Sequence, residues 1–128
     1  MKMIVRNKMF TCFFENGKPH KEDGPALEWG NGYKAWYKNG ERHREDGPAI
    51  EYHNGRKEWW FKGRRHRTDG PAVEKYERGI VFYGEFKTEK IKEWWVHGTK
   101  MTEDVFDLYK KGGGEVAVDS FKKGEDEK

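Results

Sequence analysis

Three pairs of histidine and aspartate are the residues of this chain best suited to chemistry. The members of each pair stand three residues apart: His20 with Asp23, His43 with Asp46, and His66 with Asp69. Such a pair can act as a general base beside a nucleophile, and three histidines can hold a zinc ion. Catalysis needs the third member of a triad, however. No serine or cysteine lies near any pair, Thr68 accompanies only one of them, and Cys12 precedes all three.

The pairs recur because the sequence repeats every 23 residues, the spacing that separates His20, His43 and His66. The common segment reads PHKEDGPALE at 19–28, RHREDGPAIE at 42–51 and RHRTDGPAVE at 65–74. An upstream segment repeats in the same frame, as FFENG at 13–17, WYKNG at 36–40, WWFKG at 59–63 and, after an irregular insertion, WWVHG at 94–98. We therefore divide the chain into repeats at about 13–35, 36–58 and 59–83, with a half repeat at 94–101.

Short apolar runs bounded by turn residues favour strands within each repeat. PALEW (25–29) and YKAWYK (33–38) flank Asn31-Gly32, a dipeptide suited to the positive φ angles of a hairpin turn. We expect one β-hairpin in each repeat. The segment between hairpins, which opens at Asn39-Gly40 and closes at Asp46-Gly47-Pro48, is predicted to be a loop, because proline suits the first position of a strand.

Stacked hairpins would place equivalent residues in rows. Neighbouring copies would lie two strands apart, about 9–10 Å at about 4.8 Å per strand. Zinc holds its nitrogen ligands at about 2.1 Å, so histidines in such a row could not meet on one ion. We predict no catalytic residue, no metal and no cofactor. His20, Asp23, His43, Asp46, His66 and Asp69 are expected to brace the loops through hydrogen bonds.

The C-terminal part breaks the repeat pattern. IVFYGEF (80–86), a turn at 88–90 and IKEWWV (91–96) suggest one more hairpin. Residues 102–111 are predicted to form a helix, because Thr102 suits its N-cap and Gly112 its end. Its apolar stripe, expected to dock on the sheet as a cap, consists of Val105, Leu108 and Tyr109.

The expected architecture follows from these elements. It is an all-β, single-layer antiparallel β-meander of hairpin repeats of about 23 residues with a short C-terminal capping helix. One domain would span residues 1–121, ending in a last strand at 115–121, and residues 122–128 would be a disordered tail. Aromatic residues make up 16% of the chain and aliphatic residues are few, so the core should be built from rings.

The rings form two columns in adjacent positions. The first holds Phe13, Trp36, Trp59 and Trp94, and the second holds Phe14, Tyr37, Trp60 and Trp95. Adjacent strand residues point to opposite faces, so the first column should enter the core and the second should lie on the other face. There it would either be covered by the helix and basic side-chain stems or stay exposed as a binding surface.

The repeat unit resembles the MORN-type repeat. It is closer to a divergent version, with the pattern NG…HR.DGPA.E…G…W, that occurs in small proteins of bacteriophages and large DNA viruses. The resemblance covers residues 13 to 98, and the usual MORN glycine after the basic-His stretch is replaced here by EDGPA. It implies a one-layer β-meander used for binding rather than a shared reaction.

These patterns predict a non-enzymatic module that binds another protein, with a bacterial host factor, such as an immune protein inhibited by occlusion, suggested by the resemblance. The predicted binding residues are Tyr37, Trp60, Trp95, Arg42, Arg44, Arg64, Arg65 and Arg67. Single-stranded nucleic acid is the alternative partner, although 26 basic and 23 acidic residues are interleaved. No membrane partner is expected, and a homo-oligomer stays open. One cysteine and an N-terminus without a long apolar stretch suggest the cytoplasm.

Overall fold

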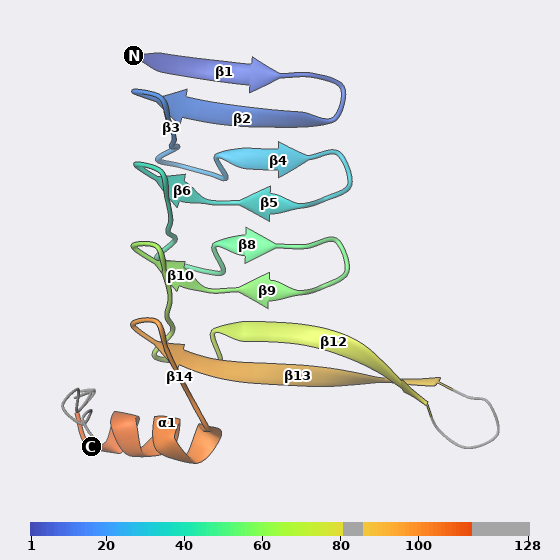
Figure 1. Ribbon diagram of the computed structural model, residues 1–128, viewed down its shortest axis with the longest axis vertical. Coiled ribbons are helices and arrows are strands. Elements are labelled where there is room, and N and C mark those ends of the chain that lie inside the picture. The colour runs from blue at the N-terminus through green and yellow to red at the C-terminus, as the bar shows by residue number, and fades with distance from the viewer. Residues whose placement is uncertain (81–85, 114–128) are drawn as a thin grey trace, which may run out of the picture.

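A computed structural model describes residues 1–80 and 86–113 of the chain (Figure 1). The protein is all-β apart from one short helix, and its hairpins lie one above another in a single antiparallel meander, as predicted. In spatial order the main sheet contains β1 (Lys2–Arg6), β2 (Phe10–Glu15), β4 (Leu27–Trp29), β5 (Lys34–Ala35), β8 (Ile50–Glu51), β9 (Lys57–Glu58), β12 (Val73–Ile80), β13 (Phe86–Val96) and β14 (Thr99–Met101).

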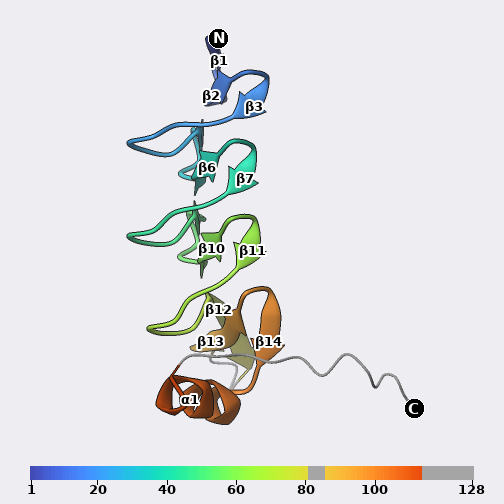
Figure 2. The same cartoon turned by 90° about the vertical axis from the view of Figure 1, so that its left-hand side faces the viewer.

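Each repeat contains a second, smaller hairpin inside the segment that was predicted to be a loop. These are β6 (Tyr37–Lys38) with β7 (Glu41–Arg42), and β10 (Trp60–Phe61) with β11 (Arg64–Arg65); β3 (Lys18–Pro19) and β14 are their counterparts at the two ends. The Asn39-Gly40 turn has φ angles of 51° and 84°, as a two-residue hairpin turn requires. The small hairpins project from one side of the sheet and the Asp-Gly-Pro loops from the other (Figure 2).

The turn at Asn31-Gly32 differs from the prediction. Only Gly32 has a positive φ, +98°, while the Asn31 side chain accepts a hydrogen bond of 3.0 Å from the Tyr33 amide. The Gly32 amide in turn donates to the Trp29 carbonyl at 3.0 Å. The same contacts recur at Asn54-Gly55, so this dipeptide closes a longer turn in which asparagine acts through its side chain.

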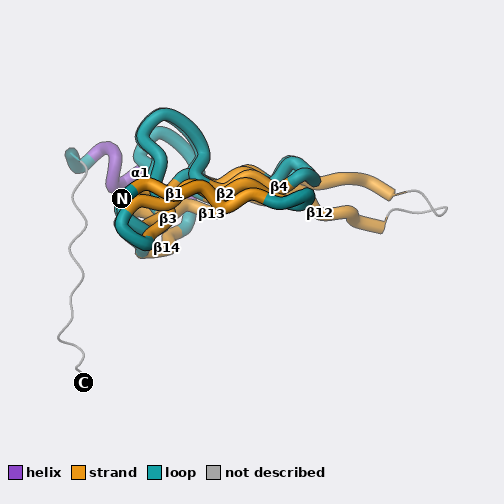
Figure 3. Tube along the Cα trace, turned by 90° about the horizontal axis from the view of Figure 1, so that it is seen from above, coloured by secondary structure: helices purple, strands orange, loops and turns teal. Residues whose placement is uncertain are grey.

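The predicted turn at residues 88–90 is wrong. Thr88, Glu89 and Lys90 lie within β13, which pairs with β12 from Val73 opposite Glu93 to Ile80 opposite Phe86. The insertion therefore lengthens the third repeat's own hairpin instead of adding another, and that repeat extends beyond residue 83 to Glu93. The long hairpin protrudes past the others (Figures 1 and 3).

The expectation of a core made of rings is also wrong. Most of the fully buried side chains are small: Ala26, Ala35, Ala49, Ile50, Ala72, Val73 and Val96. Both aromatic columns are half-buried, because a single-layer sheet has no second layer to enclose them. Cationic side chains cover the rings instead.

The helix α1 (Glu103–Lys111) begins and ends as predicted. Its N-cap Thr102 accepts a hydrogen bond of 3.2 Å from the Val105 amide, and Gly112 closes the helix. The predicted stripe is wrong, because Phe106 is the buried residue while Val105 and Leu108 are exposed. The helix contacts β13 at the end of the sheet. The strand and tail predicted at 115–121 and 122–128 lie outside the described residues.

Candidate functional site

On the loop side of the sheet, arginine guanidinium groups lie over tryptophan rings and connect the loops to the sheet. The Arg44 guanidinium stacks over the Trp36 ring with its Cζ 3.9 Å from the ring centroid. It donates to the Asp46 carboxylate at 3.1 Å, to the Pro48 carbonyl at 3.0 Å and to Glu51 at 3.2 Å. One side chain thus ties the Asp-Gly-Pro loop to the sheet.

The third repeat copies this arrangement. Arg67 stacks over Trp59 at 3.9 Å and donates to Asp69 at 2.8 Å, to the Pro71 carbonyl at 3.0 Å and to Glu74 at 3.3 Å. A Cβ on Gly70 would come within 2.9 Å of the Arg67 Cζ, which explains why glycine occupies the loop. The ion pair with Arg67 also lowers the pKa of Asp69. Arg44 and Arg67 therefore tie the loops to the sheet.

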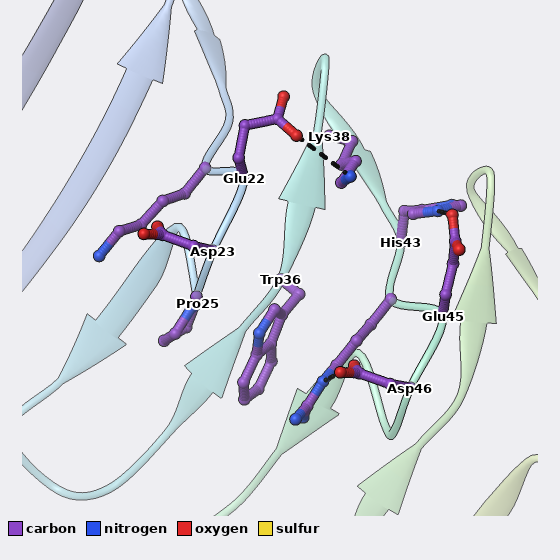
Figure 4. Close-up of a pocket in the computed structure, with 11 residues that line it drawn as sticks. Glu22, Asp23, Pro25, Trp36, Lys38, His43, Glu45 and Asp46 are labelled. Carbon is purple, nitrogen blue, oxygen red and sulfur yellow. Dashed lines mark hydrogen bonds and ion pairs between the residues drawn. The ribbon is translucent and has the colours of Figure 1, made fainter.

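A hollow lies between the loops of the first two repeats (Figure 4). Glu22 reaches toward Lys38 at 3.3 Å and Glu45 toward His43 at 3.3 Å, around a floor formed by Trp36. The residues lining it include no serine, threonine or cysteine. A His–carboxylate contact is therefore present here without the nucleophile that acyl transfer needs.

The histidines fasten each repeat to the next one. The Nδ1 atoms of His20, His43 and His66 accept hydrogen bonds from the backbone amides of Asn39, Lys62 and His97, at 3.0, 3.0 and 2.9 Å. Each acceptor belongs to one repeat and each donor to the small-hairpin turn of the following one. The described hydrogen bonds pair no histidine with its own aspartate: His20 and His43 contact Glu22 and Glu45 through Nε2.

The small-hairpin side carries a row of alternating rings and cations that we call the stacked ladder. It consists of Tyr37, Arg42, Trp60, Arg65, Trp95 and Lys100. The Cζ atoms of Arg42 and Arg65 lie 4.9 and 5.3 Å from the centroid of the Trp60 ring. The Arg65 Cζ also lies 5.1 Å from the centroid of the Trp95 ring, and the Lys100 Nζ lies 6.0 Å from the same centroid. The ladder runs through two repeats and the half repeat that follows them.

Two carboxylates underlie the ladder. Glu58, only 3% exposed, accepts hydrogen bonds from Trp60 Nε1 at 2.9 Å and Arg56 Nε at 2.8 Å, and lies 3.7 Å from Arg65. Glu93 accepts from Trp95 Nε1 at 3.0 Å. Burial would raise the pKa of Glu93, but the bond from Trp95 and the charges of Lys100 and Lys75 lower it below its usual value. Through these hydrogen bonds the two carboxylates fix the orientation of the Trp60 and Trp95 rings.

Arg42 keeps its positive charge although it is partly buried. Burial opposes the charge of Arg42, yet Tyr37, Tyr33 and Glu58 nearby keep its pKa above the usual value. The Nε atoms of Arg42 and Arg65 are buried, and neither has a hydrogen-bond partner among the described residues. Stacking on the rings therefore contributes to holding these two side chains in place.

The structure divides the predicted binding residues. Tyr37, Trp60, Trp95, Arg42 and Arg65 come together in the stacked ladder, whereas Arg44 and Arg67 lie on the loop side and Arg64 is exposed beside Gly98. Sequence reasoning missed Glu58, Glu93 and Lys100. The signal that could have found the two carboxylates is the segment KEWW, which occurs at both 57–60 and 92–95.

Within residues 1–80 and 86–113, no three His, Cys, Asp or Glu side chains are grouped as a metal site would need. In the same part of the chain, no helix combines the length and apolar character needed to cross a membrane. Comparisons of the chain with family models, with curated proteins and with solved structures found no match.

Proposed function

We propose that this protein is a non-enzymatic binding module that presents the stacked ladder to another protein. The observation that carries the proposal is the order Arg42, Trp60, Arg65, Trp95, Lys100 on one side of the sheet, with Tyr37 paired opposite Arg42. Tyrosine, tryptophan and arginine are the residues that dominate protein interfaces. Their side chains are already fixed by stacking and by Glu58 and Glu93, so binding would cost little side-chain entropy.

The same geometry favours a protein over single-stranded nucleic acid. Bases bind such surfaces by stacking on free aromatic faces. Two cations, Arg42 and Arg65, already lie over the Trp60 ring, and Arg65 and Lys100 lie over the Trp95 ring, so the ring faces are less available to bases. On the loop side, Arg44 and Arg67 are engaged by carboxylates, which reduces the charge available to phosphates. A nucleic-acid partner remains the second hypothesis.

The resemblance to viral MORN-like repeats suggests the biological setting. We infer that the partner is a bacterial host factor, such as an immune protein, and that binding in the host cytoplasm blocks a surface of that factor. The inference of a host target rests on the resemblance alone, whereas the inference of a protein-binding surface rests on the ladder.

Affinity capture from a bacterial lysate tests the proposal with two neighbouring residues. Arg65→Ala removes a guanidinium from the ladder, and Arg64→Ala removes the same charge from the opposite side of the same strand, β11. We expect Arg65→Ala to weaken capture of a specific protein by more than about tenfold and Arg64→Ala to leave it unchanged. Melting curves of both variants show whether each is folded.

Two outcomes would count against this function. Recovery of no specific protein by the folded wild type would remove its basis, as would equal capture by both variants. If nucleic acid is recovered instead, and its affinity falls steeply with salt concentration, the second hypothesis replaces the first.

A further inference from the structure

The two ends of the sheet differ in how they are protected. At the C-terminal end, α1 contacts β13 and buries Phe106. At the other end, β1 pairs only with β2 among the described strands, so its outer row of N–H and C=O groups is open. All five residues of β1 are exposed, and Met3, Ile4 and Val5 are 51%, 53% and 39% exposed. An apolar open edge is a template for another strand.

The sequence of β1 specifies what such a strand should contain. Lys-Met-Ile-Val-Arg has three apolar residues between two basic ones, so a matching strand needs three apolar residues between two acidic ones. Residues 115–119 of this chain, Glu-Val-Ala-Val-Asp, have this pattern and this length. In an antiparallel pair, Asp119 would lie opposite Lys2 and Glu115 opposite Arg6, with Ala117 opposite Ile4.

A chain cannot make this pairing with its own β1. Seven strand-to-strand steps separate β1 from β13 in the sheet, about 34 Å at about 4.8 Å per step. Gly113 follows the helix that contacts β13 (Figure 1). The six residues from there to Asp119 span at most about 21 Å when fully extended. The donor segment must therefore come from a second copy.

We propose that this protein assembles head to tail, with residues 115–119 of one copy added as a strand to the free edge of β1 in the next. A symmetric pairing of β1 with β1 is disfavoured, because an antiparallel match centred on Ile4 would place Lys2 opposite Arg6. Since donor and acceptor lie at opposite ends, the contact is heterologous and generates a chain or a ring of copies.

Charge reversal on the full-length chain tests the pairing. Lys2→Glu/Arg6→Glu reverses the acceptor, and Glu115→Lys/Asp119→Lys reverses the donor. Sedimentation velocity of the wild type should show association that increases with protein concentration. Each reversed variant alone should associate at least about tenfold more weakly. Mixing the two reversed variants should restore association, because the donor of each then matches the acceptor of the other.

A control pair, Lys8→Glu/Lys62→Glu, makes the same change in net charge as the reversed acceptor, at two exposed turn residues, and should associate like the wild type. Circular dichroism confirms that every variant is folded, which separates a lost contact from a lost fold. A wild type that stays monomeric throughout would overturn the proposal. So would reversed variants that associate normally, or a mixture that fails to regain association. None of these results depends on the ladder or its partner.

Discussion

The role of each basic residue depends on which side of the backbone its position faces. Arg42 and Arg44 are two residues apart, yet Arg42 stacks on Trp60 of the next repeat while Arg44 stacks on Trp36 of its own. The chain turns between them, because β7 ends at Arg42 and the loop to Asp46 begins. The sequence placed both arginines among the predicted binding residues, whereas the geometry puts Arg42 in the stacked ladder and makes Arg44 a clamp on its own loop.

His66 makes stability depend on pH. Burial, and then the neighbouring His97, lower the pKa of His66, whose Nδ1 must be unprotonated to accept the His97 amide. Between this lowered pKa and the usual value of about 6.5, the unfolded chain binds more protons than the native one. The contribution of His66 to the free energy of unfolding is therefore complete above about pH 6.5. It is lost as the pH falls through the pKa that His66 has in the native state.

Thermal melts at about pH 8 and about pH 5.5 check this effect. Wild type should melt at a lower temperature at the acidic pH, and His66→Gln, which cannot titrate, should show a smaller difference between the two. The lowered pKa values of Glu22, Asp69 and Glu93 keep these carboxylates ionised over this interval. An equal pH dependence in both proteins would contradict the role given to His66.

Among the elements, one dipeptide serves two kinds of turn. Asn39-Gly40 joins strands whose pairing leaves only two residues between them, Lys38 opposite Glu41, so both residues need positive φ. Asn31-Gly32 joins strands paired at Glu28 and Lys34, which leaves more residues and lets the Asn31 side chain close the turn. The dipeptide predicts a turn, but the register that decides its type comes from the pairing of the strands.

The sequence predicted the repeat frame, the meander and the ends of α1, because each rests on local signals. Periodic motifs mark the hairpins, and Thr102 and Gly112 mark the helix ends. The sequence did not predict the contacts between repeats. The order of stacking from Arg42 to Trp60 to Arg65 depends on where each small hairpin lies relative to the next one. The 12 extra residues separating Trp59 from Trp94, beyond the 23 of one period, carried no signal that they lengthen a hairpin.

The helix should stabilise the end of the sheet through one residue. Phe106 is 3% exposed, and removing its ring should cost about 3 kcal/mol, as for a buried aromatic residue. Leu108, on the same helix, is 66% exposed and offers a matched control. Chemical denaturation should give a clearly lower free energy of unfolding for Phe106→Ala and little change for Leu108→Ala. Similar losses for both variants would mean that the helix docks through another face.

On the scale of the whole molecule, the hydrogen bonds that join repeats within the described residues run between neighbouring repeats. The amides of Lys21 and Arg44 donate to the carbonyls of Tyr37 and Trp60 in the following repeats, both at 3.2 Å, and the bonds to His20 and His43 join the same repeats. Stability in such a stack is a sum of unit and interface contributions. A repeat in the middle has two interfaces and a terminal strand has one, so opening should begin at the ends.

Hydrogen exchange should show this gradient directly. The Trp36 and Trp59 amides, which donate to the Ala49 and Ala72 carbonyls inside the two central repeats, should exchange slowest, because opening a central repeat also breaks its contacts with the repeats on both sides. The amides of β1 that bond to β2 should exchange much faster, since β1 is exposed along its whole length and has one neighbouring strand. Measured in dilute solution, the exchange rates report on single copies of the chain. If copies associate through β1, its outward-facing amides should gain protection at high concentration while those of Trp59 do not change. Equal protection of β1 and the central repeats in dilute solution would show that the sheet opens as one cooperative unit instead.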